Sequence, residues 1–180
     1  MGAVVNEVPD IFLGMVMAVP FVDCLTTNLD HSLPLTVGEF DEFGNAKDNK
    51  EHFDYIYSYA PYHNIKKMDY PNILITTSLS DNRVLFDEPA KFTAKLRDYK
   101  TDNNLLLLKT EMKAGHGGKS GRDGAIEEIA IDYAFALKIS EKIWNIQTWK
   151  TKNSYHIWFV SCLMGLTKNN LANKGGYYDK

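Results

Sequence analysis

Residues 72–110 have the sequence NILITTSLSDNRVLFDEPAKFTAKLRDYKTDNNLLLLKT, in which two apolar stretches flank a helical one. The first stretch, Asn72–Ser78, is rich in β-branched residues, and the last, residues 105–110, is a short apolar run, so both predict buried strands. Residues 88–99 predict a helix with Pro89 in its first turn. This strand–helix–strand order is typical of parallel strands joined by a crossover helix.

The same alternation continues on both sides of this stretch. Residues 14–20 (GMVMAVP) predict another buried strand, and the aromatic-rich residues 51–59 predict a helix. Residues 125–139 predict the clearest helix, because apolar side chains recur at i, i+3, i+4 and i+7 spacing. These apolar positions are Ile126, Ile129, Ala130, Tyr133, Ala134 and Leu137. The chain is therefore expected to have an α/β fold with a mostly parallel sheet flanked by helices.

Residues 26–50 are rich in Asp, Glu, Gly, Asn and Pro and predict a long loop, which in a compact domain is usually functional. Asp30, Glu39, Asp41 and Glu42 lie in it. Clustered carboxylates can bind a guanidinium or ammonium group. The ligand spacing of a calcium loop is absent, and a solvated acidic loop is the alternative. The sequence predicts neither a metal nor a cofactor.

Bulk composition narrows the class of protein. With 180 residues, of which 44% are hydrophobic, the chain suits one globular unit with a substantial core. Its apolar runs are too short to span a bilayer, so no membrane partner is expected. A net charge of −3 and an isoelectric point of about 5.9 do not suit nucleic acid. Cys24 and Cys162 form neither a metal-type spacing nor a disulfide framework, which fits a reducing cytoplasm.

The charge is distributed unevenly along the chain. Residues 140–180 carry six Lys against Glu141 and Asp179, a net +4, which leaves −7 for residues 1–139. An acidic body favours basic partners or substrates through its long-range field, and a solvated acidic surface is the simpler alternative.

The composition also changes near residue 140. Residues after this point carry all three tryptophans, Trp144, Trp149 and Trp158. We therefore expect residues 1–139 to form the main unit and residues 140–180 a divergent tail. The tail is either an extra helix with a partly disordered end or non-native coding sequence appended by a frameshift.

Two residues stand out as candidates for chemistry. Asp81 follows the predicted strand Asn72–Ser78, and His116, flanked by glycines, follows the strand at residues 105–110. Carboxyl ends of parallel strands are where open α/β sheets place their sites. Asp before His is also the order that α/β-hydrolases use after their Ser. The alternative is that Asp81 is a turn residue and His116 a loop residue.

Longer motifs resemble one family. Residues 79–122, LSDNRVLFDEPAKFTAKLRDYKTDNNLLLLKTEMKAGHGGKSGR, are similar to the end of the catalytic domain of the oligopeptidases B (proteases II) of the prolyl oligopeptidase family. The resemblance includes MGAVVNEVPDIF at residues 1–12, VPFVDCLTT at residues 19–27 and PLTVGEFDEFGN at residues 34–45. It runs from residue 1 to about residue 137.

The resemblance implies a serine peptidase with an α/β-hydrolase fold that cleaves short peptides after Arg or Lys. By matching positions, Asp81 and His116 correspond to the Asp and His of the catalytic triad. Glu39 and Asp41 correspond to carboxylates that select the basic side chain, and Asp30 to a further acid near the substrate. We therefore expect basic peptides as substrates.

The resemblance also implies that two parts of the family's proteins are absent from this chain. The family's G-x-S-x-G nucleophile elbow and its β-propeller precede the segment that matches this chain, and no G-x-S-x-G occurs in the 180 residues. We therefore expect the C-terminal part of the catalytic domain, inactive alone, with an N-terminal fragment carrying the propeller and the Ser as a partner. Two alternatives remain: a non-catalytic acidic module that binds basic peptides, and a part of another α/β-hydrolase.

Overall fold

The computed structural model describes residues 1–144 of the chain. Most of the predicted tail, residues 140–180, therefore lies outside the described residues, and the division of the chain after residue 139 stays a prediction. The helices and strands in chain order are α1 (Gly2–Glu7), the 3-10 helix η1 (Pro9–Ile11), β1 (Gly14–Ala18), α2 (Cys24–Leu29), the 3-10 helix η2 (Val37–Glu39), α3 (Phe40–Phe43), α4 (Lys50–Tyr59), β2 (Asn72–Ser78), α5 (Asp87–Tyr99), β3 (Leu106–Glu111) and α6 (Arg122–Trp144).

The three strands form one parallel sheet in the order β1-β2-β3. β1 pairs with β2 in the register Gly14 to Asn72, and β2 pairs with β3 in the register Ile73 to Leu106. Because all three strands run the same way, their carboxyl ends meet at one edge of the sheet. The predicted parallel sheet with flanking helices is confirmed, and the predicted strands differ from the observed ones by at most two residues at either end.

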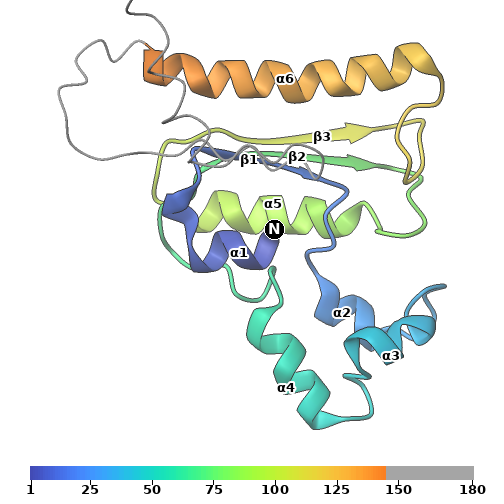
Figure 1. The fold of residues 1–180 in the computed structure, drawn as a ribbon. Helices are drawn as coiled ribbons and strands as arrows, with labels where there is room; N and C mark the ends of the chain where they lie inside the picture. Colours follow the sequence, from blue (N-terminus) through green and yellow to red (C-terminus); the bar gives the residue numbers. More distant parts are fainter. Residues whose placement is uncertain (145–180) are drawn as a thin grey trace, which may run out of the picture.

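Helices α1 and α5 cover one face of the sheet, as Figure 1 shows below the strands. Alternate residues of the strands point to this face, as the period of two along a strand requires. The core that results contains Met15, Met17, Ile73 and Ile75 from the strands, Val5 from α1, and Phe92 and Leu96 from α5. Phe92 and Leu96 are fully buried, so truncating either to Ala is expected to cost about 2–5 kcal/mol of stability.

Helix α6 covers the opposite face (Figure 1), where Phe135 and Ile139 pack on Val16 and Leu74. The close approach depends on Gly14, because a Cβ atom there would lie 2.3 Å from the Cδ1 atom of Ile139. The glycine therefore makes room for the helix at the start of β1.

The apolar residues that predict α6 are not the ones that pack on the sheet. Ile126, Ile129 and Tyr133 are exposed, and Leu137 is 67% exposed, whereas Ile139 is 1% exposed. The helix carries two apolar stripes, and periodicity identifies the helix without choosing the stripe that meets the sheet. The helix itself is also longer than the predicted 125–139.

The region predicted as a long loop, residues 26–50, contains α2, η2 and α3. These helices have three to six residues, too few to give a periodic signal. Helices α2 and α4, with the residues next to them, form a second small core, built from Cys24, Leu25, Ala46, Ile56 and Ala60. Figure 1 places α2, α3 and α4 beyond the α5 side of the sheet.

None of the helices within residues 1–144 has both the length and the apolar character needed to cross a membrane.

Candidate active site

Asp81 and His116 meet at the carboxyl ends of two neighbouring strands. Asp81 follows β2 by three residues, and His116 follows β3 by five. The Nδ1 atom of His116 lies 2.8 Å from the Oδ2 atom of Asp81. Asp81 is 4% exposed, whereas the His116 side chain is about one third exposed. A buried carboxylate therefore contacts one nitrogen of an accessible imidazole, in the relation that orients a general base.

The second oxygen of Asp81 is also occupied. Oδ1 accepts hydrogen bonds from the backbone N–H groups of Arg83, at 2.8 Å, and Val84, at 3.0 Å. Burial alone would raise the pKa of Asp81, but the Arg83 amide, the His116 ring and the Val84 amide together hold this pKa below its usual value. The carboxylate is thus charged at neutral pH and fixed in one orientation.

The loop that carries His116 is held at both ends. The N–H of Leu79 donates to the carbonyl of Glu111, and that of Ser80 to Ala114, which ties this loop to the one after β2. On the other side, the N–H of Lys119 donates to the carboxylate of Glu128 on α6. These bonds explain how two loops far apart in sequence hold Asp81 and His116 in contact.

Gly118 makes the turn after His116 possible. Its φ is +73°, a left-handed conformation that favours glycine, and its N–H donates to the carbonyl of Gly115. A Cβ atom at this position would lie 2.5 Å from the Oε2 atom of Glu128. The backbone conformation therefore favours glycine, and a larger residue would also displace the Glu128 carboxylate.

Backbone strain occurs at the same edge of the sheet. Val19, directly after β1, has a φ of +41°, which is unusual for a β-branched residue. Its N–H donates to the carbonyl of Thr76 at 2.8 Å, and its side chain lines a cavity of about 220 Å³ that also includes His116. Strained residues of this kind cluster at functional sites, where surrounding contacts hold them in place.

A larger cavity, of about 300 Å³, opens on the other side of His116. Its polar lining includes the carboxylates Glu39 and Glu88 together with Thr27 and Arg83. The apolar part of its wall is Phe21, Leu33, Pro34, Leu35, Phe43, Val84 and Leu85. An apolar cavity with a few charged groups beside a titratable side chain has the general character of a ligand site.

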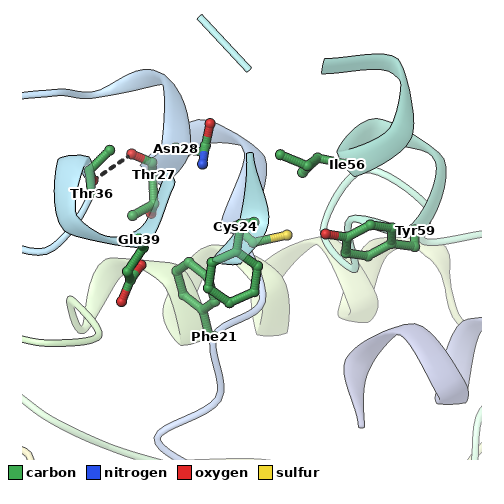
Figure 2. Close-up of a pocket in the computed structure, with 9 residues that line it drawn as sticks. Phe21, Cys24, Thr27, Asn28, Thr36, Glu39, Ile56 and Tyr59 are labelled. Carbon is green, nitrogen blue, oxygen red and sulfur yellow. Dashed lines mark hydrogen bonds between the residues drawn. The ribbon is translucent and has the colours of Figure 1, made fainter. Parts of the chain in front are cut away.

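Of the three acids predicted to bind substrate, the structure brings only Glu39 to this cavity. Figure 2 shows Glu39 with Phe21 and Thr27 around a small neighbouring pocket, where the Thr36 hydroxyl donates to the Thr27 carbonyl at 3.0 Å. Asp41 is exposed and is not part of the cavity lining. Glu39 and Asp41 are two positions apart in a helical segment, and such positions do not face the same way.

Asp30 is also outside the cavity. It is exposed at the end of α2, and its Oδ1 atom accepts hydrogen bonds from the N–H and the hydroxyl of Ser32. The Ser32 hydroxyl and N–H lower the pKa of Asp30. The carboxylate thus closes a local turn, the alternative role of Asp in loops. Asp30 and Asp41 are therefore not among the residues that line this cavity, and their predicted roles near the substrate stay predictions.

Glu88 also belongs to this site, although no sequence pattern predicts it. This residue is 2% exposed, yet it lines the 300 Å³ cavity from the first turn of α5. Its Oε2 atom accepts the N–H of Asp23 at 2.9 Å, and its Oε1 atom accepts the hydroxyl of Thr27 at 2.6 Å. Acidic residues in a first helical turn are common because they complement the helix dipole, so nothing in the pattern distinguishes Glu88.

No nucleophile completes the site within the described residues. In residues 1–144, no serine hydroxyl is hydrogen-bonded to the His116 ring, and the Cys24 thiol is buried. Burial, followed by the nearby charges of Glu88 and Asp23, raises the pKa of Cys24 to about 11, so this thiol stays protonated and unreactive. The same residues contain no group of His, Cys, Asp and Glu arranged to hold a metal ion.

Known proteins of one family are similar to this chain in both sequence and structure. Residues 1–142 match the profile of the prolyl oligopeptidase family. Protease 2 of Moraxella lacunata is 52% identical over 136 residues, which are 76% of this chain and 20% of that protein. Oligopeptidase B from Leishmania major is 45% identical, with a TM-score of 0.76 over 78% of this chain and 19% of that one.

A second solved structure of an oligopeptidase B is also similar to this chain. Oligopeptidase B from Trypanosoma brucei, with covalently bound antipain, is 47% identical, with a TM-score of 0.73 over 76% of this chain and 19% of that one. The chain thus spans about a fifth of the length of the relatives that it matches.

Proposed function

The chain belongs to the prolyl oligopeptidase family, and from this premise we propose that it supplies part of the active site of a serine peptidase that cleaves peptides after Arg or Lys. The observation that carries the proposal is the 2.8 Å contact between Asp81 and His116, two buried or half-buried side chains from adjacent strand ends. The acid-lined cavity beside His116 supports the choice of substrate.

In the proposed mechanism, Asp81 accepts a hydrogen bond from Nδ1–H of His116. This bond fixes the tautomer, so that Nε2 carries a lone pair. Nε2 takes the proton of a serine hydroxyl as its oxygen attacks the scissile carbonyl, and Asp81 stabilises the imidazolium that forms. The imidazolium then gives the same proton to the leaving amine. Water repeats the cycle on the acyl-enzyme, which restores the serine and the neutral imidazole.

The proposed preference for Arg or Lys rests on the charge of the cavity. Glu39 lines the cavity that His116 also lines, so a basic side chain bound there leaves the adjoining peptide bond near the imidazole. A guanidinium or ammonium group would form a charge-assisted hydrogen bond with this carboxylate. Asp30 and Asp41 are exposed outside the cavity, where they add to the field that attracts basic peptides.

The proposed nucleophile is not among these 180 residues. No G-x-S-x-G sequence occurs in the chain, and such a turn is what presents the serine at the end of a strand in α/β-hydrolases. We place this serine, and donors for the oxyanion, on additional polypeptide of the kind that makes up the rest of the relatives. The 180-residue chain alone is then expected to hydrolyse no peptide above background.

A chimera tests the proposal. In Protease 2 of Moraxella lacunata, the 136 matched residues are replaced by their counterparts from this chain, and hydrolysis of a fluorogenic Arg peptide is measured. We expect activity in the chimera, none in the 180-residue chain, and none in the chimera with His116→Ala.

Each of these measurements has an outcome that would contradict part of the proposal. A folded chimera that retains full activity with His116→Ala contradicts the proposed base. Turnover by the lone chain contradicts the external nucleophile. A chimera that is inactive, together with a lone chain that binds basic peptides, favours a non-catalytic binding module.

A further inference from the structure

Glu88 is a buried carboxyl group that forms no ion pair in the part of the chain that the structure describes. It is 2% exposed, and its two oxygens accept one backbone N–H and one hydroxyl, both from neutral groups. No ion pair joins it to a Lys, Arg or His side chain within residues 1–144. A charge buried in this way is costly unless it is paired.

Lys91 is the cation whose charge acts on Glu88, and it is shared with two other acids. Its ammonium lies 2.6 Å from Asp23 and 3.1 Å from Asp87, whereas it forms no ion pair with Glu88. Burial raises the pKa of Glu88, although the Thr27 hydroxyl and the Asp23 amide act in the opposite direction.

Glu88 is one of the residues that line the cavity proposed to bind the substrate side chain. Glu88 and Glu39 both line this cavity, but Glu39 is half-buried and Glu88 almost completely buried. Arg83 lines the same cavity and is exposed, and no ion pair links it to either glutamate in the described residues. The cavity is therefore lined by one carboxyl group that is partly accessible to solvent and another that is almost completely buried.

We propose that Glu88 is a specificity-determining residue, whose carboxylate lines the cavity and receives the terminal cation of a ligand's arginine or lysine side chain. The inference rests on the proposed function, because it requires a basic side chain to enter this cavity. Occupation by a cation supplies the ion pair that Glu88 does not form within residues 1–144, so binding is favoured for ligands that carry one.

Glu88→Gln separates the charge of this residue from its structural role. A glutamine has the same shape, its oxygen can accept the N–H of Asp23, and its NH₂ group can donate to the Thr27 hydroxyl, which accepts as well as it donates. Both hydrogen bonds are then kept and only the charge is lost. Thr27→Val is the matched control, because it removes one hydrogen bond to Glu88 and keeps the carboxyl group.

The probes are acetyl-glycyl-arginine amide and its citrulline counterpart, which differ in charge and hardly in shape. Their Kd values are measured by NMR titration of the 180-residue chain and of both variants. We expect the chain to bind the arginine probe more tightly, and Glu88→Gln to reduce this preference at least about tenfold, as loss of a charged hydrogen bond predicts. Thr27→Val is expected to weaken both probes together and leave the ratio unchanged.

The outcomes distinguish a failure of the role proposed for Glu88 from a failure of the proposed function. A wild-type preference for arginine that survives in folded Glu88→Gln overturns the role of Glu88 and leaves the proposed function intact. A wild-type chain with no preference for arginine overturns the basic specificity, and this inference with it.

A second measurement needs no variant. The carboxyl carbon of Glu88 is titrated by ¹³C NMR in the wild-type chain, with and without saturating arginine probe. A bound cation should lower the pKa of Glu88, and an unchanged pKa overturns the proposal. The titratable and charged groups around Glu88, whose signals are followed in the same spectra, are Asp23, Cys24, Glu39, His63, Arg83, Asp87 and Lys91.

Discussion

Asp81 and Glu88 are two buried carboxyl groups, one in contact with His116 and one lining the cavity beside it, and their pKa values are shifted in opposite directions. Asp81 is 4% exposed and Glu88 is 2% exposed, although Glu88 lies deeper in the protein. Asp81 accepts two backbone N–H groups and contacts His116, and its pKa is lowered. Glu88 accepts one N–H and one hydroxyl, and its pKa is raised by burial.

Burial alone therefore does not set the charge of an acid. Burial favours the neutral form of both groups, and the number and kind of partners decide whether that tendency is overcome. Asp81 is provided with its partners by the fold, which suits a group that must orient a base in every turnover. Glu88 forms no ion pair within residues 1–144, which suits a group whose partner arrives with the ligand.

The largest effect is expected from a substitution of Asp81. Asp81→Asn keeps an oxygen that can accept the Arg83 and Val84 amides, but its NH₂ group faces Nδ1 of His116 and favours the wrong tautomer. In the active chimera we expect kcat to fall by about 10³–10⁴ with little change in KM. Steady-state kinetics on an Arg peptide measure this, and a loss below about tenfold would contradict the orienting role.

An intermediate effect is expected from a substitution of Glu39, the partly accessible carboxyl group of the cavity. Glu39→Gln removes a carboxylate that lines the cavity, whereas Asp41→Asn removes one that does not. In the chimera, Glu39→Gln should lower kcat/KM for Arg peptides about 10–100-fold and leave a neutral peptide within about twofold. Asp41→Asn should change kcat/KM less than about fivefold, as for an exposed charge.

The ratio of these two effects is the deciding quantity. Equal losses for Glu39→Gln and Asp41→Asn would mean that the loop acts through its total charge rather than through the cavity. Equal losses for Arg and neutral peptides would mean that Glu39 has no part in selecting the substrate.

The smallest effect is expected in the pH dependence of stability, where the two acids should have opposite signs. The lowered pKa of Asp81 gives stability that is present above its unfolded value of about 3.8 and is lost as pH falls through the native pKa. The raised pKa of Glu88 gives stability that is present below about 4.5 and is lost as pH rises through the native pKa.

Urea unfolding of the 180-residue chain between pH 3 and 8 tests both signs. Relative to wild type, Glu88→Gln should gain stability as pH rises above about 4.5, because it removes a group whose ionisation opposes folding. Asp81→Asn should lose stability relative to wild type as pH rises from 3 through about 3.8, and the difference should stay constant at higher pH. Parallel curves for the two variants would show that the pKa shifts of Asp81 and Glu88 do not differ as described.

The sheet and the Asp81–His116 contact follow from local patterns in the sequence. Short apolar runs predict β2 and β3, and the crossover helix between them makes the strands parallel. Residues that follow neighbouring parallel strands must then emerge at one edge, which brings Asp81 and His116 together. The resemblance to the oligopeptidases B added the roles, which stay proposals tested by the chimera.

Local patterns failed where contacts from other segments decide the outcome. Glu39 and Asp41 are both acidic residues of one short segment, so the sequence pattern does not distinguish them. The packing of η2 and α3 places Glu39 at the cavity and leaves Asp41 in solvent. The apolar stripe that predicts α6 is exposed to solvent. Phe135 and Ile139 form the other stripe, and this one packs on the sheet beside Gly14.

By itself, the sequence determined the α/β class, the strand positions and the pair of residues at the strand ends, because hydrophobic period and chain order are local properties. Only the tertiary structure decided which acids share a cavity and which of them form ion pairs. Glu88 owes its position to hydrogen bonds with Asp23 and Thr27, more than 60 residues away along the chain. Its lack of an ion pair within the described residues is a property of that assembled environment, since Lys91 pairs with Asp23 and Asp87.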